Sequence, residues 1–190
     1  MIAGFEMGKR ILDLTLAVML APFAAFVVLL FGILIFSEDL KNPLFRQIRV
    51  GRDGRPFLLF KLRTMRVGTP DLPSHEASSA QFTRLGGFLR HVKIDELPQI
   101  WNVIRGDMSF VGPRPCLPAQ QELIHCRDAL GLSRLRPGIT GPAQIAGLDM
   151  SEPARLAKAD ALYIGRWSLM RDLRYIAATV SGSGAGDAVK

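Results

Sequence analysis

Two adjacent carboxylates, Asp95 and Glu96, open the segment KIDELPQIWNVIRGDMSFVGPRP at residues 93–115. With Pro98 in the first turn of the helix expected after it, Asp95 stands where a helix N-cap would, and capping is one reading of the pair. The other reading is chemical. The positive end of a helix favours ionised carboxylates, but each carboxylate opposes the ionisation of the other, and a shared hard cation resolves that conflict.

The chemistry that such a pair suits is phosphate chemistry. Mg²⁺ is usually held by one or two carboxylates together with substrate phosphates, and a carboxylate can attack phosphorus to form an aspartyl phosphate. Arg114 and Arg136 stand beside prolines and are candidate planar clamps for phosphate oxygens. Lys61 is a candidate point-like charge, and Arg63 shares its face of a predicted strand.

Short elements must position these residues. Residues 45–65 read as two strands around a loop that contains glycine, which predicts a β-hairpin. The fold class is therefore expected to be mainly α with a small β-hairpin, an α+β arrangement. Helices are expected at residues 81–92, from Glu96 to Arg105, at 118–130, 152–164 and 168–180, with an irregular segment at 135–150.

The run from Ile11 to Phe36 is apolar except for Asp13 and Thr15. About 20 apolar residues cross a bilayer as a helix, whereas the apolar core of a signal peptide has only about 7–15. This segment is therefore predicted to be embedded in a membrane. Asp13 is expected near the lipid headgroups, paired with Arg10.

The path of this segment has two interpretations. Pro22 lies near its middle, and Lys and Arg flank both of its ends. Basic flanks mark the cytoplasmic side of a membrane, so two of them fit a segment that enters and leaves on one face. A single spanning helix with a kink at the proline is the alternative, and the residues alone leave both open.

The charge balance favours an anionic partner. The chain has 24 Lys+Arg against 17 Asp+Glu, a net charge of +7. Residues 152–180 mix apolar and basic positions, as membrane-surface helices do, although helices that face a core look similar. Beside a membrane segment, anionic lipid is a simpler partner than nucleic acid, for which no motif is present. The scattered histidines and two separated cysteines do not have zinc-site spacing.

Five segments occur in a fixed order: KRILDLTLAVMLAP, FRQIRVGRDGRPFLLFKLRTM, KIDELPQIWNVIRGDMSFVGPRP, LRPGITGPAQIAG and DALYIGRWSLMRDL. In this combination the chain resembles the bacterial sugar transferases, specifically the small monotopic polyprenyl-phosphate phosphoglycosyl transferases. The resemblance extends from Lys9 to about Val180. Its most specific part is Asp-Glu-Leu-Pro-Gln followed by Gly-Pro-Arg-Pro.

The resemblance implies transfer of a sugar-1-phosphate from a nucleotide diphospho-sugar, usually a UDP-sugar, to undecaprenyl phosphate, with release of UMP. It implies that Asp95 is the nucleophile of a covalent aspartyl phosphosugar and that Glu96 works with Mg²⁺, so both are expected catalytic and metal-binding residues. The expected substrate- and phosphate-binding residues, including Arg63 from the strand pattern, are Lys61, Arg63, Arg114, Arg136 and Asp160.

The implied organisation has three parts. Residues 1–40 form a membrane anchor, a re-entrant helix hairpin broken at Pro22. Residues 41–180 form a catalytic domain with interfacial amphipathic helices on the cytoplasmic face of the bacterial inner membrane, and 181–190 form a flexible tail. The expected partners are undecaprenyl phosphate, a UDP-sugar and inner-membrane lipids, without nucleic acid, and a homodimer is compatible with the pattern.

The chain also departs from the family pattern. Ala21 replaces a frequent serine before the anchor proline, and Pro142, Ala146 and Leu148 replace an aromatic residue, an amide and a cation. The resemblance therefore does not carry sugar or nucleotide contacts over to that loop. The competing interpretation is a catalytically silent, membrane-anchored scaffold of a glycan-assembly complex, and a nucleic-acid-binding membrane protein has only net charge in its favour.

Overall fold

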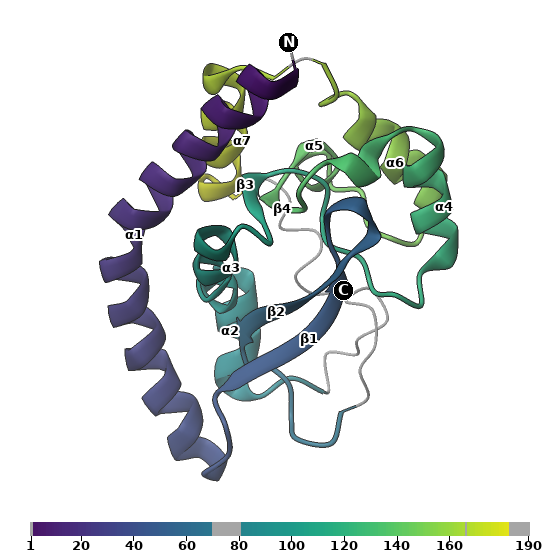
Figure 1. Cartoon of the computed structure of the whole chain (residues 1–190). Helices are drawn as coiled ribbons and strands as arrows, with labels where there is room; N and C mark the ends of the chain where they lie inside the picture. The colour runs from purple at the N-terminus through teal and green to yellow at the C-terminus, as the bar shows by residue number, and fades with distance from the viewer. Residues whose placement is uncertain (1, 70–80, 166, 183–190) are drawn as a thin grey trace.

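The computed structural model describes residues 2–69, 81–165 and 167–182. One long helix, α1 (Ile2–Asp39), lies along one side of a mixed domain that contains the hairpin β1 (Leu44–Val50) and β2 (Pro56–Leu62) (Figure 1). The other elements are η1 (Arg52–Gly54), α2 (Arg84–His91), η4 (Ile94–Glu96), α3 (Gln99–Arg105), β3 (Ser109–Val111), α4 (Gln121–Ala129), η5 (Leu132–Arg134), β4 (Gly138–Thr140), α5 (Pro142–Ile145), α6 (Pro153–Ala161) and α7 (Leu169–Val180).

The expected fold class, mainly helical with a small antiparallel hairpin, is confirmed. The predicted helices appear as α2, α3, α4, α6 and α7, with boundaries shifted by a few residues. The segment at 135–150 is more ordered than expected, because it contains β4 and α5, and β4 pairs in parallel with β3. Strands of three residues are too short for their hydrophobic alternation to be recognised in the sequence. Of the expected tail at 181–190, residues 183–190 lie outside the described part.

The hairpin brings Lys61 opposite Phe45 in antiparallel register. Its turn closes through η1, where Asp53 and Gly54 have φ values of 54° and 72°. Left-handed backbone is typical of such loops, and glycine adopts it without steric penalty. Leu59 and Leu62 of β2 are buried in the core. Lys61 is two residues after Leu59 and lies on the same face of the strand, while Leu62 lies on the opposite face.

The pairing of β3 with β4 depends on two glycines. A Cβ atom added to Gly138 would lie 2.1 Å from the backbone nitrogen of Gly112, and one added to Gly112 would lie 2.3 Å from the carbonyl oxygen of Arg136. A side chain at either position would force the backbones apart. The close approach holds the turn that begins at Gly112 and contains Arg114 against β4.

One side of α1 belongs to the core of the domain. Ala17 and Ala24 are buried with Leu59 of β2 and Val103 of α3, and Ile35 is buried in a second cluster with Leu62. The other side of α1 is exposed and apolar. Its exposed large side chains are Met7, Ile11, Val18, Met19, Leu20, Phe23, Phe26, Leu29, Leu30, Ile33, Leu34 and Phe36.

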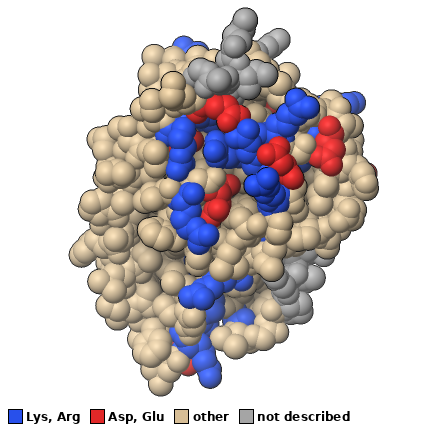
Figure 2. Space-filling model, in the orientation of Figure 1, with Lys and Arg blue, Asp and Glu red and all other residues tan. Residues whose placement is uncertain are grey.

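This exposed side has the character of a membrane-facing surface. Among the described residues, one helix is long and apolar enough to cross a membrane, and it is α1. The side of the molecule that α1 forms is almost free of charge, whereas basic and acidic side chains gather over the turn end of the hairpin (Figure 2). An uncharged surface of this size marks a contact with lipid or protein.

Polar contacts fix the first part of α1 to the domain. The guanidinium of Arg10 donates to the carbonyl oxygens of Val103 and Ile104 at 2.6 and 2.9 Å, at the C-terminal end of α3. The carboxylate of Asp13 accepts from Ser109 Oγ at 2.9 Å and from the backbone N–H of Phe110 at 3.1 Å. The expected pairing of Asp13 with Arg10 at the headgroups is therefore wrong. The carbonyl groups at the C-terminal end of a helix have no partner within the helix, and here they bind Arg10. Ser109 and Phe110 of β3 provide the donors that bind Asp13, so both side chains turn toward the domain.

Pro22 does not divide α1 into two helices. The helix continues through the proline to Asp39, and it bends near its middle in Figure 1. A proline removes one backbone hydrogen bond and clashes with the preceding turn, so a bend is its ordinary effect. The re-entrant hairpin broken at Pro22 therefore stays a prediction.

Candidate active site

The carboxylate pair does not cap a helix. Asp95 and Glu96 lie on the short 3₁₀ turn η4, and α3 begins later, at Gln99, with Pro98 in the capping position. The capping interpretation of Asp95 is therefore wrong. The 3₁₀ turn that follows Lys93, whose φ is 58°, ends at Glu96, and α3 begins only at Gln99. Asp95 is buried, with 5 % of its surface exposed. A buried carboxylate that serves no cap needs another explanation.

Lys61 of the hairpin reaches both carboxylates. Its Nζ lies 3.0 Å from Glu96 Oε1 and 3.9 Å from Asp95 Oδ2. Arg114 approaches from the turn after β3, with its Nη2 atom 3.7 Å from Glu96 Oε1. The structure thus brings together four residues predicted from separate parts of the sequence, on a strand, a 3₁₀ turn and a proline-flanked turn.

The two carboxylates of the pair have opposite pKa shifts. The pKa of Asp95 is raised to about 6, chiefly by burial and in part by the charge of Glu96, while the charge of Lys61 opposes the shift. Burial would also raise the pKa of Glu96, but the charges of Lys61 and Arg114 outweigh it and lower that pKa. Divergent pKa values in adjacent acids indicate different tasks. Glu96 is the permanently ionised member, and Asp95 is the one whose charge responds to its surroundings.

A cavity of about 440 Å³ opens beside Asp95. Several apolar side chains, among them Phe45 and Met65, line it together with basic residues. Among the described residues that line the cavity, Asp95 is the acidic one and several are basic, so the cavity has a strong excess of positive charge. This charge suits a ligand with two phosphates. The basic residues that line it are Lys41, Arg49, Lys61, Arg63, Arg66 and Arg90.

Arg90 is a site residue that the sequence did not single out. It lines the same cavity as Asp95, and its charge lowers the pKa of that carboxylate. Its guanidinium lies over the ring of Phe82, with Cζ 4.8 Å from the ring centroid. The only signal was its position five residues before Asp95, and an arginine in the last turn of a helix is common for electrostatic reasons.

Arg63 has a second role besides lining the cavity. Its Nη1 and Nη2 atoms bind the two carboxylate oxygens of Asp39 at 2.5 and 2.7 Å, and its Nε donates to the carbonyl of Asn42 at 2.9 Å. The residue thus joins the wall of the cavity to the end of α1. Its expected contact with substrate phosphate stays a prediction.

Arg136 and Asp160 lie away from the carboxylate pair. Arg136 donates from Nε to the carbonyl of Gly106 at 3.0 Å and lines a separate cavity near the start of α1. Asp160 has only 1 % of its surface exposed and accepts from Arg127 Nη2 at 3.1 Å. Neither residue reaches Asp95 directly in this structure, so their expected substrate contacts stay predictions.

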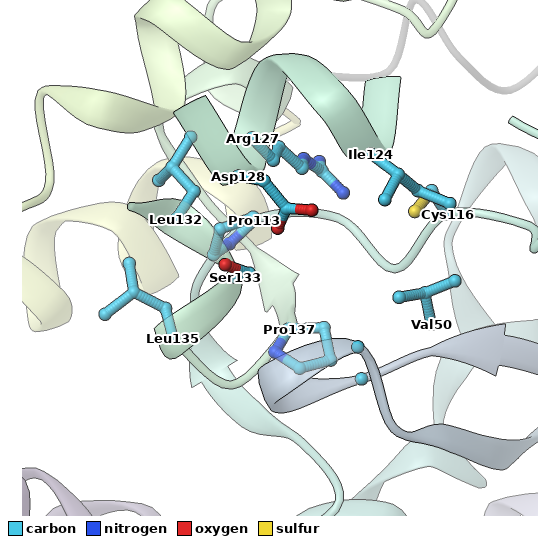
Figure 3. Close-up of a pocket in the computed structure, with 12 residues that line it drawn as sticks. Val50, Pro113, Cys116, Ile124, Arg127, Asp128, Leu132, Ser133, Leu135 and Pro137 are labelled. Carbon is cyan, nitrogen blue, oxygen red and sulfur yellow. The ribbon is translucent and has the colours of Figure 1, made fainter. Parts of the chain in front are cut away.

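Asp160 is connected to the site through Arg127. The Nη1 atom of Arg127 donates to the carbonyl oxygen of Arg114 at 2.8 Å while Nη2 binds Asp160. Figure 3 shows Arg127 and Pro113 on the wall of a small pocket of about 60 Å³ between α4 and the proline turn. The carboxylate of Asp160 therefore orients Arg127, which in turn fixes the backbone of the arginine that faces Glu96.

The replaced loop residues do not line the large cavity. Pro142 is buried in the first turn of α5, and Leu148 packs against the cluster that contains Cys116 and Leu123. Ala146 is exposed at the end of α5. Pro142 and Leu148 therefore pack within the domain, and the carboxylate pair is formed without any of the three residues.

The donor set of the pair fits Mg²⁺ when a phosphate substrate completes it. The described residues contain no group of three or more His, Cys, Asp and Glu side chains that could hold a metal alone. Mg²⁺ ordinarily takes one or two carboxylates plus substrate phosphate oxygens, and Glu96 is held in the ionised form that such a ligand requires.

Together, a buried carboxylate pair, a cationic cavity and a long apolar helix define a membrane-associated enzyme that acts on phosphorylated substrates. Residues 5–184 match the bacterial sugar transferase family. The chain belongs to this family and is a phosphoglycosyl transferase.

Curated relatives agree with this assignment. A UDP-glucose:undecaprenyl-phosphate glucose-1-phosphate transferase of Caulobacter vibrioides is 41 % identical over 184 residues, covering 92 % of this chain and 69 % of the relative. The uncharacterized sugar transferase EpsL of Bacillus subtilis is 36 % identical, over 90 % of this chain and 85 % of its own length. A UDP-galactose-lipid carrier transferase of Erwinia amylovora is 35 % identical, over 90 % of this chain and 39 % of its own length.

Proposed function

We propose that the protein transfers a hexose 1-phosphate from a UDP-hexose to undecaprenyl phosphate at the cytoplasmic face of the bacterial inner membrane, and so begins the assembly of a glycan. The names of the Caulobacter and Erwinia relatives support a glucose or galactose donor. The observation that carries the proposal is the buried carboxylate of Asp95, which lies beside Lys61 on the wall of the cationic cavity.

The first half-reaction uses Asp95 as the nucleophile. A carboxylate oxygen of Asp95 attacks the phosphorus that bears the hexose and forms a new oxygen–phosphorus bond. The bond from this phosphorus to the bridging oxygen of the diphosphate breaks, and UMP leaves with the electron pair. Lys61, Arg90 and Arg114 offset the negative charge that would otherwise repel the carboxylate from the diphosphate.

The second half-reaction regenerates the enzyme. An oxygen of undecaprenyl phosphate attacks the same phosphorus, and the Asp95 carboxylate leaves with the bonding electrons. The products are the free enzyme and undecaprenyl diphosphate hexose. Because Asp95 is the leaving group here, its low basicity relative to an alcohol favours release of the hexose phosphate.

Glu96 is the carboxylate that would bind the metal ion together with the substrate phosphates. When bound by Glu96, Asp95 and the substrate phosphates, Mg²⁺ would polarise the phosphoryl group as a Lewis acid. Glu96 is itself positioned by Lys61 and Arg114, the nearest contact being 3.0 Å from Lys61 Nζ. These contacts keep the carboxylate ionised and direct it toward the site.

The attachment of α1 supports a location on one face of the membrane. Near its start, Arg52 binds the carboxylate of Glu6 with two contacts of 2.7 Å, and Lys9 binds Asp172 of α7 at 2.8 Å. At its end, Asp39 is bound by Arg63. All of these partners belong to one polar domain, which cannot lie on both sides of a bilayer. A helix tied to this domain at both ends has both of its ends on the same side of the membrane.

Detergent-solubilised protein supplied with undecaprenyl phosphate, Mg²⁺ and a panel of UDP-sugars tests the proposal. We expect release of UMP with UDP-glucose or UDP-galactose, and a lipid product that carries hexose and two phosphates. Asp95→Asn protein prepared in the same way is the control and should release no UMP. A wild-type protein that releases no UMP with any donor would instead be a membrane-anchored scaffold.

A further inference from the structure

Gln144 has a buried polar atom that the fold leaves without a partner. The residue lies on α5, and 9 % of its surface is exposed. Its Nε2 atom donates to the carbonyl oxygen of Ile139 at 2.7 Å. This bond fixes the orientation of the amide, because the reversed amide would set two oxygens against each other. The other end, Oε1, is buried and accepts no hydrogen bond from the described residues.

Unpaired buried acceptors are rare in folded proteins, since burial without a hydrogen bond is unfavourable. Such an atom is satisfied by an ordered water or by a polar group of a ligand. Gln144 lines a cavity of about 20 Å³ that shares Arg49 and Lys61 with the large cavity. Its polar lining consists of Arg49, Lys61, Glu96, Gln99, Arg114 and Gln144.

The size and the polarity of this cavity define one kind of group. About 10–15 Å³ is enough for one water-sized atom, so the cavity has room for a small polar group such as a hydroxyl. Lys61 and Arg114 supply donors, and the Gln144 Oε1 atom supplies an acceptor. A hydroxyl both donates and accepts, and it therefore matches this lining.

We propose that the cavity receives one hydroxyl of the UDP-hexose, whose O–H donates to Gln144 Oε1 while its oxygen accepts from Lys61 or Arg114. This inference rests on the proposed function and makes Gln144 a residue that contributes to donor specificity. The hydroxyl comes from the hexose or from the ribose, and both present the same chemistry. Because Lys61 and Glu96 line the cavity and also flank Asp95, the group that enters it lies close to the reacting phosphate.

A cycle of one substitution and one substrate change tests the proposal. Gln144→Met keeps the length of the side chain but removes the acceptor. We expect kcat/KM for the natural UDP-hexose to fall about tenfold, the factor of one typical hydrogen bond. The same enzymes are then assayed with 2-, 3-, 4- and 6-deoxyhexose donors and with the 2′- and 3′-deoxyribose analogues.

One analogue should be a poor donor for the wild-type protein, also by about tenfold, and Gln144→Met should cause no further loss with that analogue. Its identity tells whether the hydroxyl belongs to the hexose or to the ribose. Gln121→Met is the matched control, because the Nε2 atom of Gln121 also donates to a backbone carbonyl, that of Pro118 at 2.6 Å, but on the surface. This control should leave every ratio unchanged.

An equal loss with every analogue would overturn the inference, and Gln144 would then bind only water or support the fold. Should Gln144→Met fail to fold, the analogue series with wild-type protein decides: if no deoxy donor is poorer than its parent, the inference is wrong. These outcomes differ from failure of the proposed function, in which the wild-type protein would release no UMP from any parent UDP-hexose.

Discussion

Arg63 binds both carboxylate oxygens of Asp39, with Nη1–Oδ2 and Nη2–Oδ1 distances of 2.5 and 2.7 Å. The last residue of α1 is thereby fixed to the residue that follows β2. At the other end, Glu6 is fixed to Arg52 of the hairpin turn by two contacts of 2.7 Å. The long apolar helix is thus held at both ends by the two ends of one hairpin. Its exposed apolar face lies between these two contacts, an arrangement that supports the proposal that both ends of the helix stay on one side of the membrane.

The first prediction concerns this topology. With Cys116 and Cys126 both replaced by serine, single cysteines at positions 4 and 55 should be equally protected from a membrane-impermeant thiol reagent applied to the periplasmic side. The reason is that both positions flank the contact between Glu6 and Arg52 and so share one side of the membrane. Both cysteines should react after the cells are permeabilised. Labelling of position 4 alone in intact cells would establish a spanning helix.

The second prediction concerns the covalent intermediate. Without undecaprenyl phosphate, wild-type protein should release UMP in an amount no greater than that of the enzyme and retain a hexose phosphate mass on the peptide that contains Asp95. Asp95→Asn should show neither, because an amide is not a nucleophile for phosphorus. Direct transfer without an intermediate predicts no adduct, together with steady-state double-reciprocal plots that intersect rather than run parallel.

The third prediction concerns the metal. Glu96→Gln should raise the Mg²⁺ concentration for half-maximal UMP release and lower the maximal rate, since a neutral amide is a weaker ligand than a carboxylate. Glu122→Gln makes the same chemical change at an exposed position of α4 and should match wild type. A Mg²⁺ titration that is identical for Glu96→Gln and wild type would place the metal elsewhere.

The sequence predicted the four central residues but not their arrangement. Each of the four stood in a local sequence pattern suited to phosphate binding. Lys61 lies on a predicted strand, Asp95 and Glu96 are an adjacent pair, and Arg114 stands between two prolines. The position of Arg90 was not predictable, because it depends on how α2 packs beside the hairpin.

The same limit explains the misread partners of Asp13 and Arg10. Asp13 and Arg10 are three residues apart on a helix, which favours a pair in isolation. In the folded chain each meets a stronger partner from a distant segment, Ser109 for Asp13 and the end of α3 for Arg10. Asp160 forms its ion pair with Arg127, 33 residues away, and its expected substrate contact stays a prediction. Contacts of high sequence separation leave no local signal.

The fourth prediction concerns pH. The pKa of Asp95 is raised to about 6, and the ionised carboxylate is the nucleophile. Single-turnover UMP release should therefore be complete above this value and decline as the pH falls through it. Because the charge of Lys61 lowers the pKa of Asp95, Lys61→Gln should move the acid limb of the residual activity to higher pH.

Lys158→Gln is the control for the pH profile, since Lys158 is exposed on α6 and away from the pair. Its acid limb should coincide with that of wild type. An acid limb that lies below pH 5 in wild type, or one that Lys61→Gln leaves in place, would show that a group other than Asp95 controls the reaction.

The fifth prediction concerns Asp160 as a positioning residue. Its carboxylate and the Arg127 guanidinium form a buried pair at 3.1 Å, and Arg127 holds the carbonyl of Arg114. Asp160→Ala leaves a buried charge unpaired and should lower the free energy of unfolding by about 3–5 kcal/mol, measured by denaturant titration in detergent. Glu152→Ala removes an exposed pair with Arg155 and should lower the free energy of unfolding by at most about 1 kcal/mol.

Asp160→Asn keeps the shape of the side chain and one acceptor. Its free energy of unfolding should lie between those of Asp160→Ala and Glu152→Ala, and it should have more activity than Asp160→Ala. An Asp160→Ala protein as stable as Glu152→Ala but without activity would mean that Asp160 acts on the substrate itself.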